Sequence, residues 1–228
     1  MQKQLLGLLA ALSIQTGNSA PFQNLGFDAG TTNTSDIRYD FVLGLVSGGG
    51  PIADLLPGWQ LFAGTDRSPT IGYNSFPLDG PNATLISQDA ATSYRFPVEG
   101  SYAALFDSGS PVTSISYSLH QQGDIPAGVK YLTILEAPGP NVNVIVTINN
   151  TLIPYSNFGN FENPNTATEI FYDISPFAGQ NVDLGLSVAS FASAKFDSVA
   201  FVVPEPSTWV LFGLGGLGLL LKGIHRCR

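Results

Sequence analysis

"VDLGLSVA", residues 182–189, is the stretch that decides the fold. Apolar residues occupy every second position of it: Val182, Leu184, Leu186 and Val188. A period of two places successive side chains on opposite faces of a strand. The stretch therefore predicts a half-buried β-strand, with its apolar residues in a core and Ser187 on the opposite face.

The same alternation recurs at residues 142–149 and 114–119, where Ile115, Tyr117 and Leu119 alternate with serines. Clusters typical of turns bound these runs: QQGDIPAG, EAPGPN and SPFAGQN. No segment between Pro21 and Val203 keeps a helical period. Many short strands separated by turns predict an all-β fold, an antiparallel β-sandwich that occupies residues 21–203 as one domain.

The charge of this region is sparse and acidic. Residues 21–203 contain 16 Asp or Glu but only five Lys or Arg. Phosphate contacts need clustered basic residues, so the composition argues against nucleic acid as a partner and leaves cations and neutral sugars. The one cysteine, Cys227, lies in the C-terminal tail, so the domain has neither a disulfide nor a thiolate metal site.

Residues 1–20 are typical of a secretory signal peptide. Lys3 precedes an apolar stretch from Leu5 to Ile14, and the small and polar residues QTGNSA follow. The apolar stretch is too short for a comfortable transmembrane helix. The alternative, a buried N-terminal helix of the fold, is disfavoured by the loop-like segment that starts at Pro21.

The C-terminus, residues 204–228, combines three features. Pro204, Glu205 and Pro206 come first, an apolar run from Ser207 to Ile224 follows, and basic residues end the chain. The prolines keep the first part extended. The apolar run is just long enough to enter a bilayer as a single helix, with the basic end on the cytoplasmic side.

This order of features resembles the PEP-CTERM sorting signal of Gram-negative bacteria. The resemblance implies export, transient anchorage in the inner membrane, and cleavage near the motif by an exosortase. It further implies release to the envelope, the outer surface or the extracellular matrix. The alternative is an ordinary single-pass anchor that is never processed. Cys227 has no role in that sorting scheme.

A second resemblance covers the domain. The segments SISYSLHQQGDIPAGVKYLTILEA and TEIFYDISPFAGQNVDLGLSVAS resemble the central strands of galactose-binding-like jelly rolls in exported bacterial proteins. The KFDSVAF segment matches the last strand of that family, and LPGWQLF looks like its tryptophan turn. The resemblance implies a jelly-roll sandwich. It does not transfer a function, because such sandwiches serve in sugar binding, adhesion and structural roles.

The galactose-binding-like resemblance also implies a structural Ca²⁺. In that family an acidic residue near the first strand meets one at the start of the last strand. Asp28 in GFDAG and Asp197 in KFDSV occupy those positions, and their oxygens are ligands that suit Ca²⁺. The alternative is that both are solvated carboxylates at strand ends.

Sugar binding needs exposed aromatic rings with polar neighbours. Trp59, Tyr73 and Tyr155 lie in loop-like, polar contexts and are the candidate ligand-binding residues. Trp59 has an alternative role in the core, because a tryptophan turn packs against the sandwich. Tyr155 is the better surface candidate, with Asn157 and Asn160 near it in sequence.

No catalytic residue can be assigned. His120 is the one histidine of the domain, so any Ser-His-Asp triad would have to use it, and no Gly-x-Ser-x-Gly elbow occurs. The glycine-rich SGGG at Ser47–Gly50 lacks the lysine of a phosphate loop and indicates a flexible turn.

The sequence therefore predicts a non-enzymatic surface or matrix protein that serves in adhesion, associates with exopolysaccharide or binds a cell-surface glycan. The alternative is a secreted hydrolase that acts on polysaccharide.

Overall fold

The computed structural model describes residues 20–31, 38–40, 45–75, 81–88, 99–109, 114–136, 144–158 and 167–203. In this part of the chain no helix is long and apolar enough to cross a membrane. Met1–Ser19 of the predicted signal peptide and all of the sorting segment, residues 204–228, lie outside the described residues.

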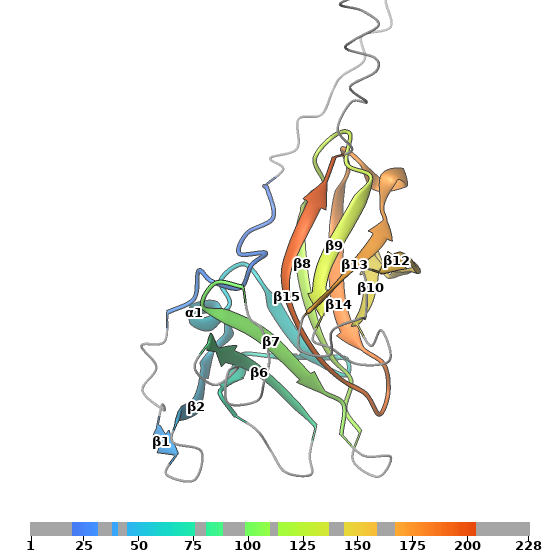
Figure 1. Cartoon of the computed structure of the whole chain (residues 1–228). Helices are drawn as coiled ribbons and strands as arrows, with labels where there is room; N and C mark the ends of the chain where they lie inside the picture. The colour runs from blue at the N-terminus through green and yellow to red at the C-terminus, as the bar shows by residue number, and fades with distance from the viewer. Residues whose placement is uncertain are drawn as a thin grey trace, which may run out of the picture.

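The described residues form two β-sheets, which confirms the predicted all-β class and its sandwich architecture (Figure 1). The strands of the larger sheet are β1 (Arg38–Asp40), β2 (Leu45–Pro51), β5 (Thr70–Tyr73), β6 (Asn82–Ser87), β7 (Tyr102–Asp107), β9 (Tyr131–Glu136), β12 (Tyr155–Phe158), β13 (Thr168–Asp173) and β15 (Ser193–Val202). Their order in the sheet is β1-β2-β5-β6-β7-β15-β9-β13-β12, and among these pairings only β5 with β6 is parallel.

The smaller sheet is wholly antiparallel in its described strands. They are β3 (Gln60–Ala63), β4 (Asp66–Ser68), β8 (Tyr117–Asp124), β10 (Val144–Ile148), β11 (Thr151–Ile153) and β14 (Asn181–Val188). Their order is β11-β10-β14-β8-β3-β4. Within the described ranges, the helical elements with defined bounds are α1 (Ile52–Leu55) and a 3-10 turn (Ser175–Phe177). The finer jelly-roll connectivity stays a prediction.

The core lies between the two sheets. Residues 182–188 of the alternating stretch VDLGLSVA lie in β14, and each of its four apolar side chains is at most 2% exposed. β10 repeats the pattern with Val144, Val146 and Ile148 buried. Aromatic rings fill the space next to the larger sheet, where Phe196 packs edge-on against Phe106 at 5.2 Å between ring centroids.

Two local predictions were wrong. Ile115 is 40% exposed, because the strand begins only at Tyr117 and the residues before it do not follow the pleat. The SGGG segment is not a turn, because Ser47–Gly50 lies in β2, where its glycines pair with β5. A Cβ on Gly49 would lie 3.1 Å from the Ile71 carbonyl oxygen, so the glycine allows a close approach of the two backbones.

The two ends of the described domain lie side by side. The Asp124 N–H donates to the Ala20 carbonyl, and the Lys130 N–H donates to the Val202 carbonyl. The rings of Phe22 and Phe201 contact each other at 5.4 Å between centroids. The loop between β8 and β9 thus holds both the first and the last described residues at one end of the sandwich.

The burial of β14 makes a stability prediction. Leu184→Ala should lower the free energy of unfolding by about 2–5 kcal/mol, because it removes buried surface and leaves a cavity. Ser187→Ala, on the opposite face of the same strand, should change it by no more than about 0.5 kcal/mol. Urea unfolding of both variants measures the two values. Equal, small effects would contradict the assigned core face.

Candidate functional site

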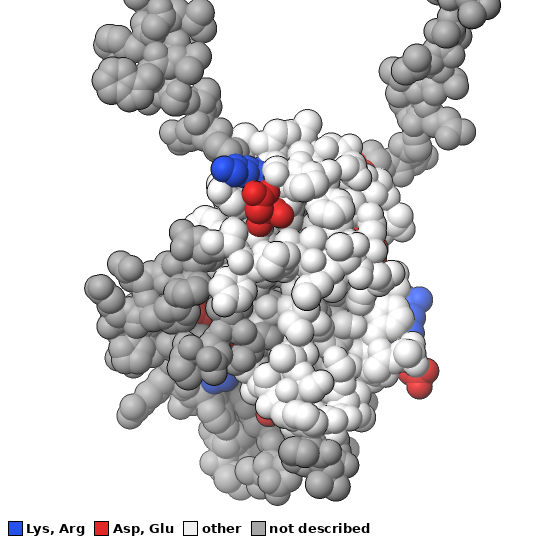
Figure 2. Space-filling view, turned by 90° about the vertical axis from the view of Figure 1, so that its right-hand side faces the viewer, with Lys and Arg blue, Asp and Glu red and all other residues white. Residues whose placement is uncertain are grey.

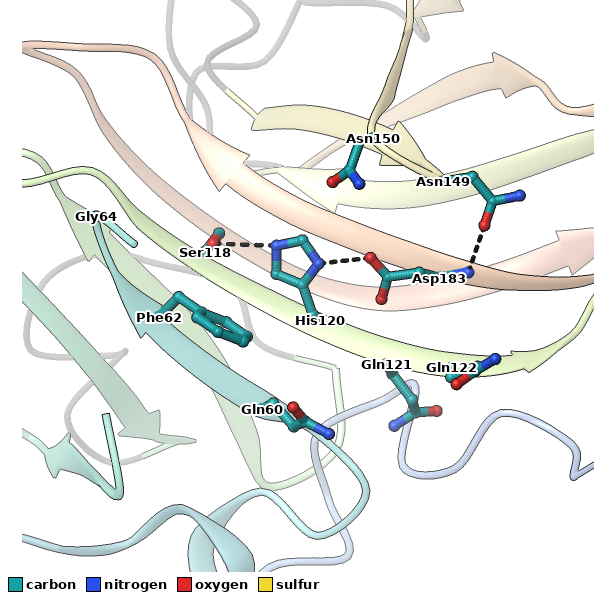
Figure 3. Close-up of a pocket in the computed structure, with 10 residues that line it drawn as sticks. All are labelled: Gln60, Phe62, Gly64, Ser118, His120, Gln121, Gln122, Asn149, Asn150 and Asp183. Carbon is teal, nitrogen blue, oxygen red and sulfur yellow. Dashed lines mark hydrogen bonds and ion pairs between the residues drawn. The ribbon is translucent and has the colours of Figure 1, made fainter. Parts of the chain in front are cut away.

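A hollow of about 480 Å³ lies on the smaller sheet (Figure 3). Its lining comes from β3 with the residue that follows it, from β8 and β14, and from the turn between β10 and β11. The lining residues are Gln60, Phe62, Gly64, Ser118, His120, Gln121, Gln122, Asn149, Asn150 and Asp183. Half of these residues carry a side-chain amide. The lining is therefore rich in groups that both donate and accept hydrogen bonds.

Gly185 makes room for the imidazole at the centre of the hollow. In the sheet, Gly185 lies opposite His120 on one side and opposite Thr147 on the other. A Cβ on Gly185 would collide with Thr147 Oγ1 and would lie 2.9 Å from His120 Cε1. The missing side chain thus lets the imidazole lie across the backbone of β14.

His120 joins two polar side chains in a line (Figure 3). Its Nδ1 lies 2.9 Å from Asp183 Oδ2, and its Nε2 lies 3.2 Å from Ser118 Oγ. An ionised carboxylate can only accept a hydrogen bond, so in a neutral imidazole Nδ1 carries the proton. Nε2 is then the acceptor for the Ser118 hydroxyl. The side chain of His120 is 23% exposed and that of Asp183 is 38% exposed, so ligands in solvent can reach both.

Two neighbours hold this line in place. The Phe62 ring packs edge-on against His120, with 5.2 Å between the ring centroids. Asn149 Oδ1 accepts a hydrogen bond from the Asp183 N–H at 2.9 Å. Asn149 and Asn150 have φ values of 51° and 61° and form the two-residue turn between β10 and β11. Asparagine tolerates this left-handed conformation, which such hairpin turns require.

The sequence did not reveal this hollow. Its residues come from four separate segments, and only the strand register brings Gln60, His120 and Gly185 into one row across the sheet. The available signal was the alternation in the SYSLHQQ segment, which places Ser118 and His120 on one face of a strand.

The predicted aromatic ligand sites lie elsewhere. Trp59 is 3% exposed and its indole N–H donates to the Asn24 carbonyl, so it packs in the core. Tyr73 is 8% exposed and packs edge-on against Tyr102. Tyr155, at the start of β12, is 49% exposed. The structure therefore leaves Tyr155 as the exposed ring of the three, and none of them lines the hollow.

Asp28 and Asp197, the predicted Ca²⁺ ligands, both bind the segment that leads into β7. Asp28 Oδ1 accepts hydrogen bonds from the N–H groups of Ser101 and Tyr102 at 2.7 and 3.0 Å. Asp197 Oδ2 accepts one from the Glu99 N–H at 2.8 Å. The two carboxylates thus connect the start of the domain, this segment and the last strand.

Asp197 is 2% exposed, and this burial raises its pKa from an ordinary 3.8 to about 7. Hydrogen bonds from the Ser198 and Glu99 N–H groups oppose the rise, and the negative charges of Asp28 and Glu99 add to it. Asp197 therefore keeps its proton to a higher pH than an ordinary aspartate does.

The donor chemistry at Asp28 and Asp197 fits Ca²⁺, since carboxylate oxygens are its usual ligands. No three His, Cys, Asp or Glu side chains within the described ranges are grouped to hold a metal ion. A cation here would thus bind two carboxylates, with backbone carbonyls and water as its other ligands.

The raised pKa predicts how the metal-free protein responds to pH. Between about pH 4 and pH 7 the folded chain keeps a proton on Asp197 that the unfolded chain has lost. The free energy of unfolding should therefore fall as pH rises through this window, by an amount on the order of 2 kcal/mol. Asp197→Asn, which cannot ionise, should flatten that part of the profile.

Melting curves in EDTA at a series of pH values measure this effect. The difference between wild type and Asp197→Asn isolates Asp197 from the other groups that titrate in the same range. Parallel profiles for the two proteins would show that Asp197 does not titrate as stated.

The sequence comparison confirms the predicted PEP-CTERM motif. Residues 202–226 match the model of the PEP-CTERM protein-sorting motif. The motif marks the chain as an exported protein, targeted by an exosortase and sorted to the cell envelope of Gram-negative bacteria. No curated protein matches the chain in sequence.

Solved structures show distant likenesses. An apo form of a cyclase from Fischerella sp. is 15% identical, with a TM-score of 0.47, over 82% of this chain and 98% of that chain. The structure of TmCBM61 in complex with β-1,4-galactotriose is 13% identical, with a TM-score of 0.38, over 64% of this chain and 88% of that chain. At these TM-scores the likenesses say nothing about the function of this chain.

Proposed function

We propose that this exported, exosortase-sorted protein binds a glycan in the hollow of the smaller sheet and serves as an adhesion or exopolysaccharide-associated component of the cell surface or matrix. The observation that supports the proposal is the lining of the hollow. It combines five side-chain amides with Ser118, His120, Asp183 and the ring of Phe62.

A neutral sugar presents hydroxyl groups that both donate and accept hydrogen bonds, so it needs partners of both kinds. The amides of Gln60, Gln122 and Asn150 supply both, and the carboxylate of Asp183 supplies a strong acceptor. Figure 2 shows one side of the molecule on which Lys, Arg, Asp and Glu are scattered over a mostly uncharged surface. A weakly charged surface suits a neutral polysaccharide better than a polyanion.

A glycan array with the full chain in detergent tests this proposal. Gln60 is exposed, so Gln60→Ala should weaken binding about tenfold, equivalent to 1.4 kcal/mol, without loss of stability. Phe62→Ala should weaken binding at least as much.

Tyr155→Ala is the matched control, because its exposed ring is the second candidate platform and lies in the other sheet. Loss of binding in Tyr155→Ala alone would move the site there. Release of shortened sugars by the pure protein would favour the alternative, a polysaccharide hydrolase.

We include in this proposal that the domain is released from the membrane after export. Cleavage near Pro204–Pro206 would free the domain from its membrane anchor after export. Intact-mass measurement on protein from the native envelope should show the loss of about 19–20 N-terminal residues and of the hydrophobic C-terminal run. A full-length mass would contradict processing at both ends.

We further propose that a structural Ca²⁺ binds at Asp28 and Asp197. The supporting observation is that the carboxylates of Asp28 and Asp197 both bind the segment before β7, and carboxylate oxygens are ligands that suit Ca²⁺. A ligand that binds only the folded state raises stability by about 2.7 kcal/mol at a hundredfold excess over its Kd. Added Ca²⁺ should therefore raise the melting temperature of wild type but not of Asp197→Ala. Identical melting of wild type in EDTA and in Ca²⁺ would exclude the site.

A further inference from the structure

The polar line in the hollow has the atom order of a nucleophilic triad. A carboxylate lies at one imidazole nitrogen, and a serine hydroxyl lies at the other. The bond to Asp183 Oδ2 fixes the tautomer in which Nε2 can accept a proton from Ser118. In a serine hydrolase this arrangement lets the imidazole act as a general base toward the hydroxyl.

We infer that Ser118, His120 and Asp183 form a hydrolytic triad that cleaves a small O-acyl ester, such as an acetyl group on a sugar hydroxyl. The inference goes beyond the predicted non-enzymatic role. It rests on the proposed function for the sugar that carries the ester, while the triad itself stands on the geometry of three side chains.

The chemistry balances with water as the one co-reactant. Ser118 Oγ attacks the acyl carbonyl carbon while its proton passes to His120 Nε2. The ester C–O bond then breaks, and the leaving sugar oxygen takes the proton from Nε2. A water molecule next attacks the acyl-serine and gives a proton to Nε2, which returns it to Ser118 Oγ as the carboxylic acid leaves. Asp183 is a positioning residue that stabilises the imidazolium.

The negative oxygen of the tetrahedral intermediate needs hydrogen-bond donors, and side-chain amides can supply them. Gln60 lies directly opposite His120 in the sheet, and Asn150 lies on the turn that borders β14 (Figure 3). Both amides line the same hollow as the triad. Gln60 Nε2 and Asn150 Nδ2 are therefore the candidate donors to that oxygen.

The position of His120 is not a by-product of core packing. A Cβ on Gly185 would lie 2.9 Å from His120 Cε1, so the glycine leaves space for the ring beside β14. Ser118 and Asp183 are half-buried, so the hydroxyl is held against the imidazole while the hollow still admits a ligand.

The test uses the full chain in detergent, with a fluorophosphonate probe and with p-nitrophenyl acetate. A fluorophosphonate reacts with an activated serine, so peptide mapping should find the probe on Ser118. Ser118→Ala should abolish the labelling and lower ester hydrolysis on the order of a hundredfold or more. Ser187→Ala is the matched control, since Ser187 lies opposite Ser118 in the sheet and does not line the hollow.

The role of Asp183 has its own readout. Asp183→Asn should lower hydrolysis by about tenfold or more and move the midpoint of its pH profile, because the imidazolium loses its carboxylate partner. A merely structural role would change neither the pH profile nor the labelling of a variant that remains folded by circular dichroism.

The outcomes separate this inference from the proposed function. Labelling of Ser118 with hydrolysis that needs Ser118 and His120 supports the triad, whether or not a glycan binds. Glycan binding by wild type, with no labelling and no hydrolysis above the Ser118→Ala level, overturns the triad and keeps the binding function. Hydrolysis that survives in Ser118→Ala also overturns it.

Discussion

The burial of one face of β14 is the constraint on which both the core and the candidate site depend. Val182, Leu184 and Leu186 fix the orientation of the strand, because a shift of one residue would expose all of them to water. The same orientation fixes Asp183 and Gly185 on the outer face, beside His120 of β8. The packing of the core therefore also fixes the site, because the residues beside the imidazole alternate along β14 with the buried residues.

A second constraint connects the ends of the domain. Asp28 and Asp197 accept hydrogen bonds from backbone N–H groups of the segment before β7. The carboxylate of Asp28 occupies the space that a Cβ on Gly100 would fill. Burial of an ionised carboxylate is costly, and the raised pKa of Asp197 reflects that cost. The Ca²⁺ proposed above would compete with that proton for the same oxygen atoms.

Local pattern in the sequence was enough to predict the strands with strict alternation. In β10 and β14 every second residue along the whole strand is apolar, so the sequence alone predicts which face is buried. Ile115 shows the limit of such a prediction, because the alternation in sequence begins three residues before β8, where the backbone is not yet a strand. The prediction for the SGGG segment was wrong because glycine composition indicates a turn, whereas pairing with β5 makes the segment part of a strand.

The candidate site could not be predicted in the same way. Trp59 and Tyr73 have polar neighbours in sequence, yet tertiary packing buries both rings. The hollow depends on which strands are neighbours in the sheet, and the chain order of β3, β8 and β14 does not contain that information. The C-terminal motif differs, because a sorting enzyme reads it as a linear segment, so a sequence pattern alone identifies it.

His120, at the centre of the hollow, lies away from the ends of the described domain. The described ends meet at the loop after β8, next to Asp124 and Lys130. His120 precedes Asp124 by four residues of extended strand, which is about 13 Å along the sheet. His120 therefore lies in the middle of β8, whereas the described ends meet at the end of that strand. If the C-terminus is cleaved as proposed, Ser118, His120 and Asp183 stay together in the domain, because all three precede residue 204.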